Sequence, residues 1–158
     1  SKGATTIPFD GCDILHGSSN KLIQDVCECV ENSDDLKKLK PQRDKLRWKK
    51  KKLQTYYVCA SSTTEHNVAA MRLVYDTDYL IIDYLFIMPY MRNMGFGTIM
   101  VNFARFLALS NIQAPKVLIT LSTKESSSFW ISKGFLKCKI QDRKRLNPYD
   151  DTYLMVLR

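Results

Sequence analysis

The sequence predicts one α/β (α+β) domain built on a single mixed sheet with helices on both faces. Its 158 residues suffice for one domain and are too few for two ordinary ones. A composition of 45% hydrophobic and 25% charged residues is typical of a folded globular chain and excludes a disordered one. The order of apolar segments sets the class, because hairpin-like strands precede a βαβ unit formed around a strongly apolar helix.

The first third of the chain predicts an edge strand and two helices. Thr5–Phe9 is short and apolar and contains a proline, so we expect an edge strand, and Gly11–Gly17 has the character of a loop. After the N-cap candidate Asn20, apolar residues recur at helical spacing until Asn32–Asp35. A second helix is expected over Pro41–Leu53, with its proline in the first turn and a thin apolar seam that places it on the surface.

The middle of the chain changes to a strand pattern. Thr55–Ala60 is rich in Tyr and Val, and with Val68–Tyr75 it predicts a hairpin about the polar turn Ser61–Asn67. After another turn at Asp76–Asp78, Tyr79–Met88 predicts a third, long strand. This strand is apolar on both faces, which is typical of a central strand.

The last part of the chain predicts a buried helix between two buried strands. A loop at Pro89–Met94 leads into Gly97–Leu109, which is hydrophobic almost all round and is therefore expected to be buried. The remaining elements are expected to be a strand over Lys116–Leu121, a helix over Glu125–Lys133 that Gly134 ends, and strands over Phe135–Ile140 and Thr152–Leu157. The expected order is β-α-α-β-β-β-α-β-α-β-β.

Basic residues are concentrated in one segment. The chain carries 24 Lys and Arg against 16 Asp and Glu, a formal net charge of +8. Ten of the basic residues lie in Lys37–Lys52 beside one acid, Asp44, so the rest of the chain is close to neutral. Such a run can contact nucleic acid or another acidic surface, and it can act as a nuclear import signal. A solvated helix whose lysine stems cover apolar surface gives the same pattern.

Cysteine and histidine usage argues for a reducing, intracellular compartment and against a structural metal. The five cysteines are odd in number and match no disulfide framework. There is no CxxC motif, and His16 and His66 are the two histidines, so a zinc site is not expected.

No apolar run reaches the roughly 18–20 residues of a membrane span, and no signal peptide is visible. A chain that starts at Ser1 is expected to be a piece of a longer protein.

The most informative motif is Arg92–Gly97 (RNMGFG), which lies between the predicted central strand and the apolar helix. Its two glycines let the backbone turn tightly and approach a ligand closely. The helix that follows offers free N–H groups and the positive end of its dipole, and together these features predict a pyrophosphate site. The motif lacks the Lys-Ser/Thr ending of a P-loop and the spacing of a dinucleotide-binding loop.

Two motifs together resemble a known family. Leu85–Pro89, followed by the R-x-x-G-x-G pattern that starts at Arg92, is similar to the strand-to-helix signature of the GNAT superfamily of acetyl-CoA-dependent N-acetyltransferases. Phe129–Phe135 is similar to the aromatic-x-x-x-Gly-Phe element of the same superfamily. The resemblance is best over Leu80–Phe135, and the motif spacing is closest to the histone and protein lysine acetyltransferase branch. It implies a GNAT-like fold, acetyl-CoA as co-substrate and no metal.

By this resemblance the backbone would hold most of the cofactor. Amides of Met94–Thr98 would bind the CoA pyrophosphate, and backbone groups of Phe86–Met88 would pair with the pantetheine arm as with an extra strand. Ser126 could contact a phosphate or the pantetheine, although helix capping explains it equally well. The expected cofactor-binding residues are Phe86, Ile87, Met88, Arg92, Asn93, Met94, Gly95, Phe96, Gly97, Thr98, Ser126 and Trp130.

Asp83, on the predicted central strand, is the candidate general base. A lysine amine has a reference pKa of about 10.4, so some group must take its proton. Ile81 and Leu85 would flank Asp83 on its own face of the strand, and burial there would raise its pKa. In the histone branch a Glu has this spacing from the glycine motif. Because Asp is one methylene shorter, transfer through a water is an alternative to direct abstraction, and a simple ion pair with a nearby Lys or Arg is another interpretation.

Trp130 stands where many small-molecule members of the superfamily carry a tyrosine, four residues before the glycine of the aromatic element. That phenol protonates the departing thiolate, and an indole cannot replace it in this role. CoA thiolate is a fair leaving group, since a thiol pKa is about 8.5, so the acid can be dispensable. An impaired enzyme is the alternative, and Tyr149 or Tyr153 of the last hairpin could supply a phenol instead.

Acidic residues border the acceptor groove that the resemblance implies. They could attract a cationic substrate, and ordinary solvated surface charges would give the same pattern. These residues are Asp25, Glu28, Glu31, Asp34, Asp35, Asp150 and Asp151. The basic run Lys37–Lys52 could contact DNA or an acidic surface while the groove receives a lysine tail.

Taken together, these observations predict an N-acetyltransferase for lysine amines of a protein such as a histone, by direct attack in a ternary complex with Asp83 as base. Backbone amides of the central strand would polarise the thioester carbonyl. The alternatives are an acetyltransferase for small amines or protein N-termini, a GNAT module that binds CoA or a partner without turnover, and a nucleic-acid-binding domain that relies on the basic run. A nuclear location would fit the first prediction.

Overall fold

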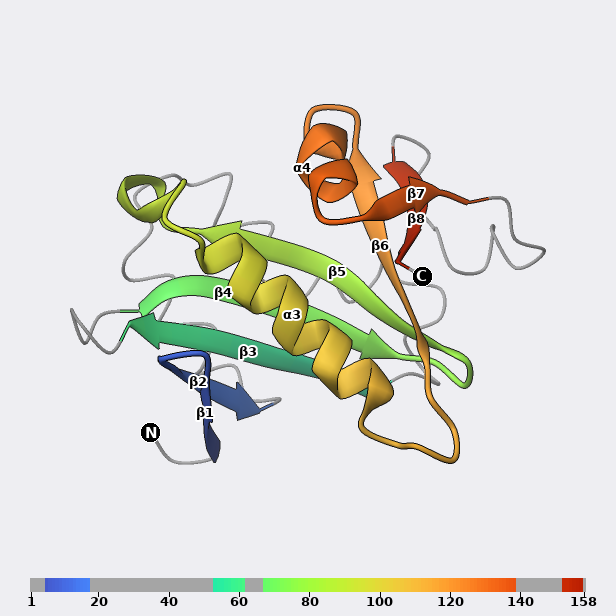
Figure 1. The fold of residues 1–158 in the computed structure, drawn as a ribbon, viewed down its shortest axis with the longest axis horizontal. Coiled ribbons are helices and arrows are strands. Elements are labelled where there is room, and N and C mark those ends of the chain that lie inside the picture. Colours follow the sequence, from blue (N-terminus) through green and yellow to red (C-terminus); the bar gives the residue numbers. More distant parts are fainter. Residues whose placement is uncertain (1–4, 18–52, 62–66, 139–151, 158) are drawn as a thin grey trace.

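The computed structural model describes residues 5–17, 53–61, 67–138 and 152–157. Within these residues the strands form one eight-stranded sheet in the order β1-β2-β3-β4-β5-β6-β8-β7 (Figure 1). The strands are β1 (Thr5–Phe9), β2 (Cys12–Gly17), β3 (Leu53–Ser61), β4 (Asn67–Tyr75), β5 (Tyr79–Ile87), β6 (Val117–Thr123), β7 (Phe135–Lys137) and β8 (Thr152–Leu157). Helices α3 (Phe96–Leu109) and α4 (Ser127–Ser132) and the 3₁₀ turn η3 (Pro89–Met91) complete the described elements.

The sheet is mixed, as the sequence predicts. β5 pairs with β6 in parallel, and the other neighbouring strands are antiparallel. β5 lies between β4 and β6, which confirms the prediction of a central strand. β3 starts at Leu53, where the sequence predicts the end of a helix, so that boundary is wrong.

The prediction of a loop at Gly11–Gly17 is wrong. β2 begins at Cys12 and pairs with β1 through a two-residue turn at Asp10 and Gly11, whose φ angles are 50° and 77°. A turn with two positive φ angles matches the twist of the strands, and Asp-Gly is one of its preferred sequences. That dipeptide is a hairpin signal in the sequence itself.

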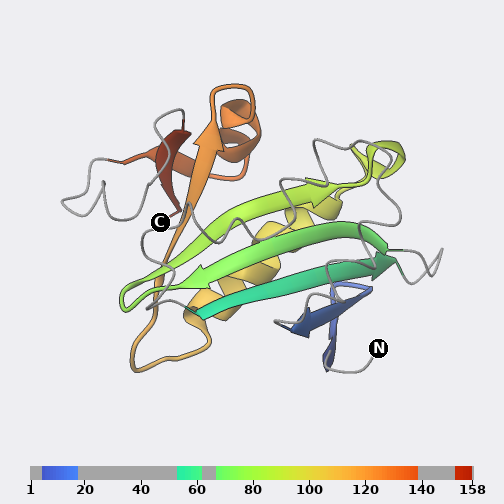
Figure 2. The ribbon, with the colours of Figure 1, turned by 180° about the vertical axis from the view of Figure 1, so that it is seen from behind.

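Helix α3 confirms the predicted helix but not its complete burial. Phe106 and Leu109 are each 53% exposed, while five residues of the inward stripe are buried. The helix lies across one face of the sheet, and in Figure 2, seen from behind, it lies beyond β4 and β5. A helix that covers a single face needs only one apolar stripe.

Both described helices lie on the same face of the sheet. α4 packs against β6 and β7, and its neighbour on the other side is α3, because the Phe129 ring lies where a side chain on Gly97 would point. α4 and β7 are both shorter than the sequence predicts. The helix predicted after Asn20 lies outside the described residues, as does the helix predicted over Pro41–Leu53 except for Leu53, which begins β3.

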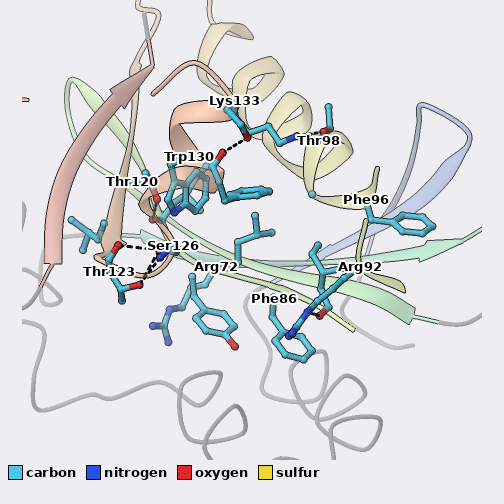
Figure 3. A pocket seen from close by; sticks show the side chains of 18 of the residues that line it. Arg72, Phe86, Arg92, Phe96, Thr98, Thr120, Thr123, Ser126, Trp130 and Lys133 are labelled. Atoms are coloured by element: carbon cyan, nitrogen blue, oxygen red, sulfur yellow. Dashed lines mark hydrogen bonds between the residues drawn. The ribbon is translucent and has the colours of Figure 1, made fainter. Parts of the chain in front are cut away.

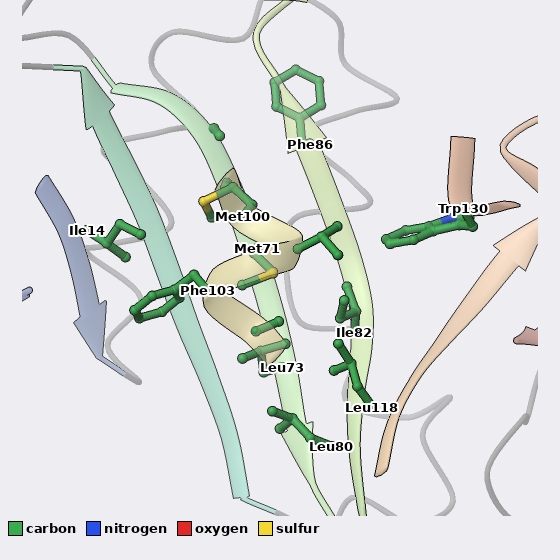
Figure 4. Close-up of a cluster of buried hydrophobic side chains, with 14 of the residues drawn as sticks. Ile14, Met71, Leu73, Leu80, Ile82, Phe86, Met100, Phe103, Leu118 and Trp130 are labelled. Atoms are coloured by element: carbon green, nitrogen blue, oxygen red, sulfur yellow. The ribbon is translucent and has the colours of Figure 1, made fainter. Parts of the chain in front are cut away.

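The main core lies between α3 and the sheet (Figure 4). Met100 and Phe103 of α3 are fully buried, and Met71, Leu73 and Ile82 of β4 and β5 belong to the same cluster. Each fully buried side chain of this kind contributes about 1.5–3 kcal/mol. A second, smaller cluster joins β4, β5, β6 and β8. The two clusters together hold β5 and β6 firmly where these strands pair.

β5 and β6 pair over only part of their length. Their register ends where Ile82 lies opposite Thr120. β5 continues to Ile87 and β6 to Thr123, but the two strands diverge (Figure 1). Among the described strands, the backbone edge of β5 that faces β6 therefore has no partner over residues 83–87.

Candidate active site

A cleft of about 780 Å³ opens between the diverging ends of β5 and β6 (Figure 3). Residues 82–87 of β5, the turn before α3, the first turn of α3 and one side of α4 line it. Residues 92–97 and 129–133, which belong to the two motifs described above, thus meet at one cleft although they lie far apart in sequence. Their meeting makes this cleft the candidate active site.

Most residues expected to bind a cofactor lie in the wall of this cleft. They are Phe86, Ile87, Arg92, Asn93, Gly95, Phe96, Gly97, Thr98, Ser126 and Trp130. The side chains of Met88 and Met94 do not line it: Met88 is buried in the core, and Met94 is 63% exposed. The expectation for Met94 therefore concerns its backbone amide alone. The backbone groups of Met88 already have partners, because its amide donates to the carbonyl of Val68 (2.9 Å) and its carbonyl accepts from the amide of Met91 (2.8 Å).

The turn before α3 leaves the N-terminus of that helix open. Asn93 and Gly95 have φ angles of 63° and 90°, in the left-handed region that lets the chain reverse before Phe96. The first helical bond runs from the amide of Ile99 to the carbonyl of Gly95 (3.1 Å). No side chain of the described residues caps this end, and the first turn of the helix holds no acidic residue. The first-turn amides and the positive end of the helix dipole are therefore available to an anion.

Gly97 is required for a different reason. A Cβ at this position would lie 2.9 Å from Cε1 of Phe129, closer than real Cβ contacts allow. A side chain here would push α4 away from α3. The second glycine of the motif thus sets the width of the cleft rather than the turn of the backbone.

Lys133 is a cleft residue that the sequence did not indicate as part of the site. Its Nζ donates a hydrogen bond to Oγ1 of Thr98 (2.5 Å) in the first turn of α3. The same ammonium lies 5.3 Å from the ring centroid of Phe129. Lys133, which follows α4 at its C-cap, therefore brings a positive charge to the open N-terminus of α3.

Arg92 ties the turn to the end of β5. Its Nε donates to the carbonyl oxygen of Ile87 (3.1 Å), and its guanidinium carbon lies 5.8 Å from the centroid of Phe86. The Phe86 ring is in turn stacked on Tyr84, with an interplanar angle of 7°. These contacts fix the open edge of β5 beside the turn.

Asp83 occupies a β-bulge. In the pairing of β4 with β5, Arg72 lies opposite Tyr84 and Leu73 lies opposite Ile82, so Asp83 is the extra residue. Asp83 reaches the face of Arg72 by ordinary alternation, because its neighbour Ile82 pairs with Leu73. The bulge brings Tyr84 to the same face and turns Leu85 to the other one. Leu85 pairs with Met71 on the other face, so the expectation that Leu85 flanks Asp83 on its own face is wrong.

Asp83 and Arg72 form a buried ion pair. Nε of Arg72 donates to Oδ2 of Asp83 at 2.6 Å, and the two side chains are 7% and 1% exposed. Among the described residues neither Oδ1 of Asp83 nor Nη1 of Arg72 has a hydrogen-bond partner, although both atoms are buried. Burial raises the pKa of Asp83 above its ordinary value, and the charge and hydrogen bond of Arg72 oppose that shift without cancelling it.

The geometry combines the two interpretations of Asp83. One carboxylate oxygen of Asp83 accepts a hydrogen bond from Arg72, and the other has no partner within the described part of the chain. Asp83 itself lines the cleft. Arg72 carries a signal that the sequence does contain, since it is a charged residue in a strand whose inner residues are otherwise apolar. What the sequence does not contain is the pairing of residue 72 with residue 83.

Trp130 is part of the core as well as of the cleft wall. It is 5% exposed and makes edge-to-face contacts with Phe129 and Phe135, at centroid distances of 5.0 and 5.2 Å. Trp130 therefore fills the place of the tyrosine with an apolar ring. Of the two alternative phenols, Tyr149 lies outside the described residues, and Tyr153 is described by its backbone alone, opposite Ser122.

Ser126 precedes α4 but does not cap it with its side chain. Its hydroxyl instead bonds with the hydroxyls of Thr123 (2.9 Å) and Ser122 (3.2 Å). The capping interpretation is therefore wrong for this residue. The hydroxyl group remains at the cleft wall, where β6 ends.

Several expected features lie outside the described residues. They are the basic run Lys37–Lys52 and the acidic residues Asp25, Glu28, Glu31, Asp34, Asp35, Asp150 and Asp151. Within the described part of the chain, no group of three His, Cys, Asp or Glu residues is arranged to hold a metal ion. In the same part, no helix is long and apolar enough to cross a membrane.

Comparison with known proteins concerns the fold. No protein-family model matches the sequence, and no curated protein matches it significantly. Among solved structures, Tetrahymena GCN5 matches with a TM-score of 0.64 and 14% identity, over 98% of this chain and 94% of that one. A chimera of the spermidine N-acetyltransferase SpeG from Vibrio cholerae with hSSAT matches with a TM-score of 0.63 and 12% identity, over 94% and 95%.

A third match is Arabidopsis thaliana Naa50 in complex with the bisubstrate analogue CoA-Ac-MVNAL. Its TM-score is 0.50 and its identity 14%, over 65% of this chain and 72% of that one. All three proteins are GNAT acetyltransferases. At identities this low the similarity concerns the fold alone.

Proposed function

We propose that this chain, which has the GNAT acetyltransferase fold, transfers an acetyl group from acetyl-CoA to a primary amine. The observation that carries the proposal is the pairing of two features in one cleft: an uncapped helix N-terminus beside Lys133, and a buried carboxylate with a raised pKa. The first suits a polyphosphate ligand, and the second suits the removal of a proton from an amine.

The cleft fits CoA in three respects. Amides of residues 94–98 and the ammonium of Lys133 would hold the pyrophosphate, because they concentrate positive charge beside a first helical turn that holds no acidic residue. The open edge of β5, residues 83–87, would pair with the amides of the pantetheine arm as a strand does. The width between α3 and α4, set by Gly97, leaves room for the arm between these elements. No metal is required.

The proposed reaction is a direct transfer in a ternary complex. The neutral amine attacks the thioester carbonyl carbon, a C–N bond forms, the C–S bond breaks, and the thiolate of CoA leaves. Oδ1 of Asp83, which has no hydrogen-bond partner among the described residues, accepts the proton that the amine loses, directly or through a water. Trp130 offers no phenol, so the thiolate leaves as an anion and takes its proton from solvent.

For the acceptor we propose a protein lysine, as in a histone tail. The spacing of Asp83 from the glycine turn and the apolar ring of Trp130 favour this class over small amines. A basic run at Lys37–Lys52 that contacts DNA or an acidic surface, and a nuclear location, would accompany it. A small-amine acceptor is the second candidate, because a spermidine N-acetyltransferase chimera has the same fold with a comparable TM-score.

The test is transfer of labelled acetyl from acetyl-CoA to a panel of core histones, peptides with a free N-terminus, and polyamines. Histone labelling is the expected result, and Asp83→Asn should lower it by about 10²–10⁴-fold while CoA binding stays unchanged. Labelling of polyamines alone would replace the lysine acceptor by a small amine. CoA binding without transfer to any acceptor would leave a CoA-binding module and overturn the enzymatic proposal.

A further inference from the structure

The Arg72–Asp83 pair is costly if its role is only structural. Two charged side chains are taken out of water, yet only one hydrogen bond joins them, and Oδ1 and Nη1 remain buried without partners among the described residues. A buried ion pair of this kind is often no more stabilising than apolar side chains of similar volume. Incompletely satisfied, perturbed pairs in a cleft are typical of functional sites.

The strand pairing supplies the geometry that the ion pair needs. Because Leu73 lies opposite Ile82, ordinary alternation along both strands puts Arg72 and Asp83 on the same face of the sheet. The bulge adds Tyr84 to that face, directly opposite Arg72 on β4. The side chain of Asp83 is almost completely buried, while its backbone lies on the unpaired edge of β5.

Other charged groups around the cleft are few among the described residues. Tyr84 is the titratable neighbour on β5 itself, and Arg92 and Lys133 line the same cleft from the turn before α3 and from α4. From β6 comes Thr120, an uncharged residue whose hydroxyl donates to the carbonyl of Ile82 (3.1 Å). Arg72 is the cation in direct contact with the carboxylate.

We propose that Arg72 is a positioning residue for the general base: it holds Asp83 by Oδ2, keeps the carboxylate ionised in its buried place, and leaves Oδ1 for the acceptor amine. The inference rests on the proposed acetyl transfer, and it adds the residue that keeps the general base of that reaction ionised and oriented. A buried carboxylate without a cation would become neutral, and a neutral carboxylic acid cannot accept the proton. The planar guanidinium also fixes which oxygen is engaged, which a lysine ammonium does not.

The experiment compares the wild-type chain with R72Q and R72K. The titration of Asp83 is followed by NMR of chain labelled with ¹³C at the aspartate carboxyl carbons, and Asp83→Asn identifies the signal. R72Q is expected to raise the titration midpoint by about one to three pH units. R72K, which keeps the charge, is expected to titrate near the wild type. An unchanged midpoint in R72Q would overturn the proposal.

Kinetics provides the second readout. The acid limb of kcat/KM should move upward with the NMR midpoint in R72Q, so that activity lost at neutral pH returns at higher pH, while the Kd for CoA is unchanged. A loss that is equal at every pH would indicate a structural role and contradict the inference. If R72Q does not fold, R72K decides: a midpoint that rises there by a full unit or more would contradict the role of the charge.

The titration needs no turnover, so the two proposals fail separately. A wild-type chain that transfers acetyl to no acceptor contradicts the proposed function. If the titration midpoint of the Asp83 carboxyl signal does not change in R72Q, the result contradicts the role of Arg72, whatever the activity of the chain.

Discussion

Asp83 is a carboxylate with two opposing influences on its proton affinity. Burial makes the ionised form unfavourable, and Arg72 makes it favourable, with burial the larger effect. The result is a base stronger than an exposed aspartate. The same balance lowers the stability of the folded chain whenever Asp83 is ionised, because the folded state then holds a charge that water would solvate better.

This balance predicts a pH-dependent difference in stability between the wild type and Asp83→Asn. The pKa of Asp83 in the folded state lies above its ordinary value of about 4. At any pH between the ordinary pKa and the folded-state pKa, the folded state therefore binds more protons than the unfolded state. The free energy of unfolding of the wild type should therefore fall, relative to that of the variant, as pH rises through this window, and then level off. Urea unfolding at a series of pH values measures the difference.

The opposite slope would contradict the pKa direction. A difference that grows in favour of the wild type with rising pH would mean that Arg72 outweighs burial and that the folded pKa is depressed. The cost of leaving Arg72 without its partner in the variant does not affect this test, because arginine stays charged throughout the range and shifts the curve by a constant.

Substitutions of Gly95 and Gly97 are predicted to lower stability for different reasons, and only the substitution of Gly97 should also weaken CoA binding. At Gly95 a Cβ meets no atom within 4 Å, so Gly95→Ala carries the strain of a left-handed φ, about 1–2 kcal/mol, and Gly95→Asn should cost less. At Gly97 the Cβ meets the Phe129 ring, so Gly97→Ala should destabilise by about 1–3 kcal/mol and also weaken CoA binding by displacing α4. Thermal unfolding and calorimetric titration with CoA compare the three variants. Equal effects of Ala and Asn at residue 95 would argue against backbone strain as the cause.

At the scale of elements, α3 and α4 form one anion site from two helices. The first turn of α3 supplies amides, and α4 supplies Lys133, whose bond to Thr98 joins the two. A charge-assisted hydrogen bond to a phosphate contributes about 1.5–3 kcal/mol. The pair of helices should therefore bind CoA more tightly than the helix N-terminus of α3 would alone.

Lys133→Met is predicted to weaken CoA binding by about tenfold or more and to reduce its dependence on salt concentration. Lys124→Met is the matched control, because Lys124 is an exposed lysine just before α4 that does not line the cleft. Calorimetric titrations at two salt concentrations measure both effects. Equal affinities of the two variants would show that Lys133 serves only to join the helices.

The elements that the sequence predicts well are those with long apolar patterns, such as β4, β5 and α3. The glycine turn and the aromatic element could also be found in the sequence, because their residue types are fixed by backbone geometry and by close packing. The bulge at Asp83 could not, since a register shift depends on the partner strand. The contacts of Asp83 with Arg72 and of Lys133 with Thr98 were beyond prediction for a similar reason: they join separate elements, 11 and 35 residues apart.

At the scale of the whole molecule, the cleft exists because β5 and β6, the one parallel pair of the described sheet, separate toward their C-terminal ends. Antiparallel neighbours hold β1 to β5 on one side and β6 to β8 on the other. β5 and β6 join these two groups over four residues each and then diverge. A ligand that pairs with the open edge of β5 would complete the hydrogen bonding that the sheet leaves unmade there.

This architecture predicts a local pattern of hydrogen exchange. With saturating CoA, the amides of residues 83–87 that point to the open edge of β5 and those of the first turn of α3 should exchange more slowly, because the pantetheine arm and the pyrophosphate accept their hydrogen bonds. The β1–β2 hairpin lies at the far edge of the sheet and should gain no more protection than global stabilisation gives, about 2.7 kcal/mol at 100 times the Kd. Exchange followed by mass spectrometry, with and without CoA, tests this. Protection at α3 without protection of β5 would support the pyrophosphate site at the helix N-terminus. It would contradict the proposal that the pantetheine arm pairs with β5 as a strand does. Uniform protection across the sheet would mean that the ligand acts through overall stability and not through the open edge.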